Sequence, residues 1–130
     1  MAKRTKTAEQ GRAIMRQLFG EAEMVKRDAS TTDFNEASRN FSDENCFGSV
    51  WARPGIATRD RSLMCISHLA ALGRMAEMQQ HIEAALRNKF LTPSEIKEIC
   101  LQTIVYCGLP AGQATTRAAE EALLRFQARD

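Results

Sequence analysis

Two residues that can exchange a proton near neutral pH, Glu77 and His81, lie four positions apart. On a helix such residues are neighbours on one face. We expect His81 at the margin of the apolar stripe that includes Met78 and Ile82, and Glu77 slightly further out. A carboxylate beside an imidazole at such an edge can act as a general acid. The same spacing is typical of an exposed ion pair that contributes little, so spacing alone leaves both interpretations open.

The other histidine, His68, lies inside the most apolar segment of the chain, where we expect it to be desolvated and neutral. Such a histidine can equally be a core residue bonded to the backbone. Cys65, His68 and His81 could in principle share a metal ion, but they lack the spacing of a known metal motif. The sequence therefore predicts no metal site.

The segment around Pro54-Gly55 combines the single tryptophan, Trp51, with Arg53, while Arg59 and Arg61 follow closely. Guanidinium groups grip carboxylates through paired hydrogen bonds, so these arginines could hold a small dianion. The alternative is a solvated loop and helix start. Cations at a helix N-terminus oppose the helix dipole, which favours a functional role for arginines in that place.

Helical elements must position these side chains, because the apolar spacing follows the helical period and no alternating β-rich run competes. The prediction is an all-α fold, a single-domain bundle of about six helices over residues 1–130. The expected helices cover residues 7–19, 34–47, 59–72, 74–88, 92–107 and 111–127.

Local signals set the expected helix ends. Thr7 and Thr58 are candidate N-caps, and Gly48 is expected to end the second helix before an irregular segment at 50–55. The strongest signal is Thr92-Pro93-Ser94-Glu95, a capping box with proline at the first helical position. On the helix that it opens, we expect an inner stripe from Ile96 to Cys107.

The segments 59–72 and 92–107 carry more apolar surface than one small domain can easily cover. We therefore expect a homo-oligomer.

Composition excludes several classes of protein. The 130 residues include 18 Lys and Arg against 16 Asp and Glu, a net charge of +2, which argues against nucleic-acid binding driven by bulk charge. No apolar run is long enough to cross a membrane, and the basic start lacks the apolar core of a signal peptide. We expect a cytoplasmic protein with four free thiols.

Several segments, in one order along the chain, resemble those of the gamma-carboxymuconolactone decarboxylases, a family of the alkylhydroperoxidase D-like superfamily. The similarity covers roughly residues 10–125. The segments are 47–56 (FGSVWARPGI), 61–63 (RSL), 69–74 (LAALGR), Glu77 and His81 with 84–88 (AALRN), 92–99 (TPSEIKEI) and 105–111 (VYCGLPA).

This resemblance implies an all-helical enzyme without a cofactor, which decarboxylates a lactone bearing two carboxylates to an enol-lactone in the β-ketoadipate (protocatechuate) pathway. It implies a homohexamer, a trimer of dimers. Carried onto this chain, it makes His81 and Glu77 the catalytic residues. It makes Arg53 and Arg61 the carboxylate-binding arginines, with Trp51 as a wall of the pocket. His68 stands where these decarboxylases more often carry an apolar residue, so it could be a second proton-handling group.

Three alternatives stay open beside this function. The chain could decarboxylate another small carboxylated lactone, or it could bind such a molecule without turnover. It could also be a thiol-based hydroperoxide reductase. The redox branch of the superfamily carries a C-x-x-C motif just before the histidine, where this chain has Arg74 and Glu77, and this difference disfavours the thiol reaction.

Overall fold

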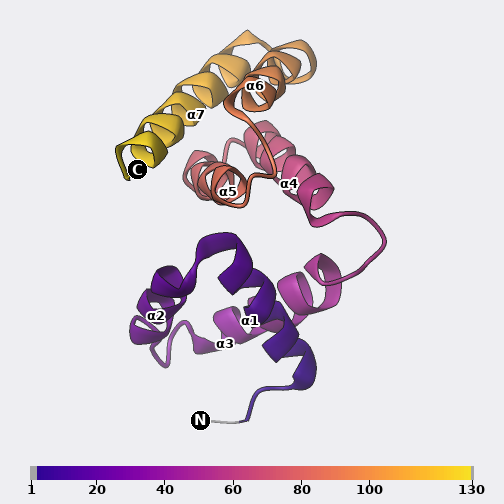
Figure 1. Cartoon of the computed structure of the whole chain (residues 1–130), viewed down its shortest axis with the longest axis vertical. Helices are drawn as coiled ribbons and strands as arrows, with labels where there is room; N and C mark the ends of the chain where they lie inside the picture. Colours follow the sequence, from indigo (N-terminus) through magenta and orange to yellow (C-terminus); the bar gives the residue numbers. More distant parts are fainter. Residues whose placement is uncertain (1–2, 130) are drawn as a thin grey trace. The chain divides into compact units, whose positions relative to one another are not determined.

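The computed structural model describes residues 3–129, which are almost entirely helical and contain no strand, as the sequence predicts. The contacts group the chain into two compact units, Met1–Ala57 and Thr58–Asp130. The prediction of a single domain stays a prediction. Unit 1 contains α1 (Lys6–Phe19), α2 (Glu21–Ala29), α3 (Glu36–Phe41) and a π-helix, η1 (Ser42–Trp51); unit 2 contains α4 (Thr58–Leu72), α5 (Met75–Arg87), α6 (Pro93–Cys107) and α7 (Leu109–Arg129) (Figure 1).

Helix α1 begins one residue before the expected start. Its N-cap is Thr5 rather than Thr7, because the Thr5 hydroxyl accepts a hydrogen bond from the Ala8 amide at 3.0 Å. Gly20, with φ 94°, ends the helix as expected. The charged stretch that follows forms α2, which the sequence analysis did not predict. Only Met24 of α2 is buried, so the apolar pattern there is too sparse to reveal a helix.

The π-helix η1 replaces the end of the expected helix at 34–47. Hydrogen bonds that span five residues mark it, such as the Ala52 amide donating to the Phe47 carbonyl at 3.0 Å. Gly48 does not end the helix but lies inside η1. A Cβ on Gly48 would lie 2.3 Å from the carbonyl oxygen of Thr7 in α1, so this close packing admits only glycine.

Phe34, Ala37 and Phe41 keep the helical spacing on which the expected helix at 34–47 rests, and this spacing predicts that they form its buried face, which is wrong. Phe34 is 97% exposed and Phe41 64% exposed, whereas Asp43 is 1% exposed. This segment therefore packs through a buried carboxylate and a glycine.

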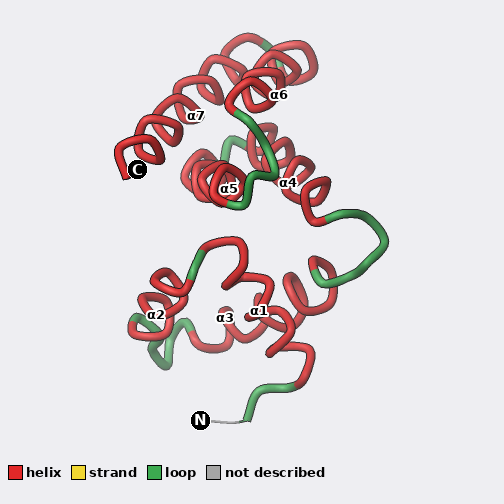
Figure 2. Tube along the Cα trace, in the orientation of Figure 1, coloured by secondary structure: helices red, strands yellow, loops and turns green. Residues whose placement is uncertain are grey.

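In unit 2, α4 and α5 form a helical hairpin around Gly73, and α6 and α7 pack together along the chain's last third (Figures 1 and 2). Their apolar faces meet in one core. Its members include Ile66, Ala70, Met78, Ile82, Ala85, Ile96, Ile99, Cys100, Ala118, Ala119 and Ala122. The four helices of unit 2 begin within two residues of their expected starts, α4 at Thr58, α5 at Met75, α6 at Pro93 and α7 at Leu109.

The predicted capping box at the start of α6 is confirmed. The Thr92 hydroxyl accepts a hydrogen bond from the Glu95 amide at 3.2 Å, and Pro93 occupies the first turn. The inner stripe of α6 is shorter than expected, because Thr103 is buried while Cys107 is exposed. Gly108, with φ 94°, caps the end of α6, and Pro110 lies beyond it in the first turn of α7, where its missing N–H costs nothing.

Among residues 3–129, no helix combines the length and the apolar composition that crossing a membrane requires.

Candidate active site

His81 lies on α5 beside the buried positions Met78 and Ile82, and its side chain is mostly buried. Its Nδ1 atom is shielded from solvent. Burial lowers the pKa of His81 from 6.5 to about 4, because the charged imidazolium loses its hydration. In the free protein this imidazole is therefore neutral at pH 7.

Glu77 is exposed one turn before His81 on α5. As expected, Glu77 lies further from the apolar stripe of α5 than His81 does. What either residue does in a reaction stays a prediction.

Arg61 and His68 lie seven residues apart on α4, so they share one face of that helix. Arg61 is partly buried and its Nε atom is shielded from solvent. His68 is exposed, which corrects the expectation that it would be desolvated. The reason is that Ser62, Ile66 and Ala70 form the buried stripe of α4, and His68 falls outside it.

Helices α4 and α5 are in contact, so Arg61, His68, Glu77 and His81 all lie on one pair of packed helices.

Trp51 and Arg53 belong to unit 1. Trp51 is the last residue of η1 and stacks on Phe47, with ring centroids 5.8 Å apart and planes 26° apart. Phe47 also meets Phe19 of α1 edge-on at 6.2 Å. Val50 and Trp51 were expected in an irregular segment but are the last two residues of the π-helix. Arg53 is exposed in the loop that follows.

Arg59 has a structural role that the sequence did not reveal. It forms an ion pair with Glu95 of α6 and lies 3.4 Å from Asp60. These two carboxylates offset the unfavourable position of a cation at the start of α4.

Two of the four cysteines, Cys65 and Cys100, lie in surroundings that disfavour a thiol reaction. All four are free, and burial raises the pKa of Cys65 to about 11 and also raises that of Cys100, so both remain protonated thiols at neutral pH. Within residues 3–129, no three His, Cys, Asp or Glu side chains cluster as a metal site would require.

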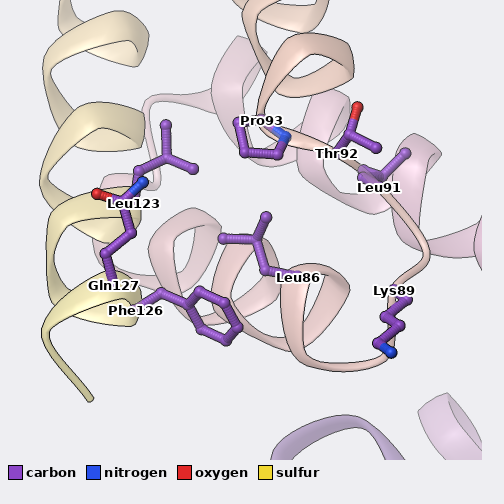
Figure 3. A pocket seen from close by; sticks show the side chains of 8 residues that line it. All are labelled: Leu86, Lys89, Leu91, Thr92, Pro93, Leu123, Phe126 and Gln127. Atoms are coloured by element: carbon purple, nitrogen blue, oxygen red, sulfur yellow. The ribbon is translucent and has the colours of Figure 1, made fainter. Parts of the chain in front are cut away.

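A hollow of about 420 Å³ lies in unit 2 between the end of α5, the loop before α6 and the last turns of α7 (Figure 3). Its lining is mostly apolar. The residues are Leu86, Lys89, Leu91, Thr92, Pro93, Leu123, Phe126 and Gln127. None of the six predicted site residues lines it.

Sequence reasoning missed Asp43 and Arg12, which are 1% and 5% exposed. Arg12 approaches Asp43 at 3.5 Å and Asp28 at 2.6 Å, and Arg27 lies 2.8 Å from Asp43. The only available signal was a row of charged residues of both signs, which is more often a solvated surface.

The sequence matches a known protein family and is similar to known proteins. The chain matches the carboxymuconolactone decarboxylase family over residues 38–121, a range that contains all six predicted site residues. It is 38% identical over 112 residues to the 4-carboxymuconolactone decarboxylase of Acinetobacter baylyi, covering 86% of this chain and 83% of that protein. It is 30% identical over 109 residues to the nitrosuccinic acid decarboxylase npaB of Metarhizium robertsii, covering 75% of this chain and 76% of that protein. Matched over most of its length, and with the histidine and arginines of the predicted site inside the matched range, the chain belongs to the carboxymuconolactone decarboxylase family.

Proposed function

We propose that the protein is a carboxy-lyase that converts gamma-carboxymuconolactone to the β-ketoadipate enol-lactone and CO2 in aromatic catabolism. The single observation that carries this proposal is the 38% identity, over most of both chains, to a protein with that name. The buried histidine of α5 gives the reaction a proton-handling group in a water-poor setting.

The substrate itself supplies the electron sink. The departing carboxylate is attached next to a C=C bond that is conjugated to the lactone carbonyl. When its C–C bond breaks, the electron pair moves through the C=C bond onto the carbonyl oxygen and forms a dienolate. A proton added to the carbon beside the carbonyl then gives the enol-lactone. The protein must bind one carboxylate, leave the other poorly hydrated and deliver one proton.

We assign the carboxylate grip to Arg53 and Arg61, because a guanidinium group binds a carboxylate through two parallel hydrogen bonds. Trp51 is assigned to the pocket wall. His68, on the same face of α4 as Arg61, stays in the substrate-binding set as a second proton-handling group.

We assign proton delivery to His81, with Glu77 as its partner. His81 is neutral in the free protein at pH 7. A bound dianion favours the imidazolium through its charge, and the exposed carboxylate of Glu77 adds to this effect. Substrate binding would therefore raise the pKa of His81 and bring a proton with it, which makes the acid available only when the substrate is present.

Exposed apolar side chains support the predicted homo-oligomer, a hexamer built as a trimer of dimers. The end of α6 and the start of α7 present Leu101, Val105, Tyr106 and Leu109, which are 50–78% exposed in the single chain. Large apolar side chains that stay this exposed in one chain are typical of a protein interface. The cytoplasmic location also remains a prediction from the sequence.

A second candidate substrate is a small nitro-substituted dicarboxylic acid, which the relative from Metarhizium robertsii favours. A nitro group next to the departing carboxylate can also accept the released electrons, so the same arginines and histidine would serve.

Rates of CO2 release from the two substrates test the proposal. We expect kcat/KM for gamma-carboxymuconolactone to exceed that for nitrosuccinic acid by at least ~100-fold, because the dienolate must match the site to be stabilised. The reverse ratio would assign the protein to the second substrate class. No CO2 from either would contradict the decarboxylase function.

A further inference from the structure

A buried carboxylate outside the proposed catalytic set lies at the start of the π-helix. Asp43 of η1 is 1% exposed, and its two oxygens lie 2.8 Å from Arg27 of α2 and 3.5 Å from Arg12 of α1. Burying a carboxylate is unfavourable unless cations compensate for its lost hydration. These pairs therefore tie η1 to both preceding helices.

The two arginines are themselves held in place. Arg12 is 5% exposed and donates a hydrogen bond to Asp28 of α2 at 2.6 Å. Arg27 donates to the backbone carbonyl of Arg39 in α3 at 3.2 Å. Because these contacts hold Arg12 and Arg27 in place, the two arginines in turn fix the position of Asp43.

Glycines bring η1 unusually close to α1 at the same level. A Cβ on Gly11 would lie 1.9 Å from the Asp43 carbonyl oxygen and 2.6 Å from the Gly48 amide. The π-helix therefore packs against α1 in one position, which is determined by the close contacts at the glycines and by the ion pairs of Asp43.

The register of η1 decides where its last residues lie. π-Helical turns are rare and are stabilised by tertiary contacts rather than by local preference. If η1 shifted by one residue toward α-helical geometry, each later side chain would turn by about 100°. Phe47 and Trp51 would then turn together, Phe47 would lose its edge-on contact with Phe19 of α1, and Arg53 would move with them.

We propose that Asp43 is a positioning residue, which through Arg12 and Arg27 holds η1 in the register that presents Trp51 and Arg53 to the substrate. This proposal rests on the proposed function only for the roles of Trp51 and Arg53. The control of the position of Trp51 by Asp43 does not depend on the proposed function.

Because Trp51 is the only tryptophan, its fluorescence reports the end of η1 without any substrate. We expect Asp43→Asn to raise the acrylamide quenching constant of Trp51 about twofold or more while the far-UV circular dichroism stays that of a helical protein. Glu23→Gln is the matched control, because it also removes a carboxylate charge from unit 1 but Glu23 pairs with Lys26 on the exposed side of α2, and it should leave the quenching unchanged. If Asp43→Asn does not fold, Arg27→Lys replaces it, since it keeps the charge but loses the guanidinium geometry.

Kinetics with gamma-carboxymuconolactone form the second part of the test. Asp43→Asn should raise KM about tenfold and change kcat much less, because the misplaced Arg53 weakens substrate binding. In an Arg53→Ala background the same change should have a clearly smaller effect on kcat/KM, because Asp43 acts through Arg53.

Unchanged Trp51 quenching in a folded Asp43→Asn or Arg27→Lys variant would overturn the positioning role. So would changed quenching with an unaltered KM, or effects of Asp43→Asn and Arg53→Ala that simply add. A wild-type protein inactive on the lactone, with quenching raised in the variant, would overturn the proposed function and the kinetic role while leaving the control of Trp51 by Asp43 supported.

Discussion

His81 is the residue to which we assign proton delivery. Burial lowers its pKa to about 4, so the imidazole is neutral in the free protein, and its side chain is only partly exposed. A general acid must carry its proton at the working pH, so this role requires that the bound dianion raise the pKa of His81. On this proposal, proton delivery would depend on substrate binding.

Replacing His81 by Gln should lower kcat for gamma-carboxymuconolactone by ~100-fold or more with a much smaller effect on KM. The reason is that a positioned general acid contributes about 10²–10⁴ to the rate, whereas the carboxylates stay bound to the arginines. Steady-state kinetics of CO2 release measure both constants. A variant that keeps more than about a third of wild-type kcat would exclude His81 as the acid.

The protein should lose stability as the pH falls from about 6.5 to about 4. Over this range His81 is protonated in the unfolded chain but not in the folded protein. The free energy of unfolding therefore falls by on the order of 3 kcal/mol in total. Denaturant unfolding at several pH values measures the slope. His81→Gln should flatten it, while His68→Gln, which alters the exposed histidine, should not. Equal slopes in both variants would contradict the burial of His81.

At the scale of elements, the sequence predicts most of unit 2 because local and tertiary signals agree there. The capping box at Thr92 and the apolar stripe of α5 both correspond to real features. In unit 1 the local and tertiary signals disagree. Phe34 and Phe41 follow a helical period yet are exposed, whereas Asp43 is buried by partners far away in the chain. Such pairing, like the π-helix itself, depends on contacts that no local pattern encodes.

Gly48→Ala should destabilise unit 1 by about 1–3 kcal/mol, because the new methyl group would overlap the Thr7 carbonyl oxygen and force the helices apart. Chemical unfolding followed by Trp51 fluorescence reports this unit directly. The exposed neighbour Ser49→Ala serves as the control. Equal unfolding midpoints for both variants would mean that α1 and η1 are not closely packed.

At the scale of the whole molecule, the chain leaves many large apolar side chains exposed. On α4, Met64 and Leu72 are 43% and 73% exposed, so this helix is not covered all round within one chain. Together with the patch at Leu101 and Val105, they are the surface that the predicted oligomer would bury.

Val105→Glu should dissociate the oligomer, since a charge at a 73%-exposed apolar position would be buried without a partner in the assembly. Light scattering should give about 87 kDa for a wild-type hexamer of 14.5 kDa chains and a lower mass for the variant. Gln17→Glu adds the same charge on an exposed position of α1 and should keep the wild-type mass. A monomeric wild-type protein at micromolar concentration would contradict the proposed assembly.

The most direct test of the central claim is decarboxylation of gamma-carboxymuconolactone in D2O, with the product analysed by NMR before it decays. An acid fixed in the protein delivers its proton to one face of the dienolate. We expect stoichiometric CO2 and an enol-lactone that carries one deuterium beside the carbonyl, in a single stereochemical configuration. Recovery of unchanged lactone, or an equal mixture of both configurations, would contradict it.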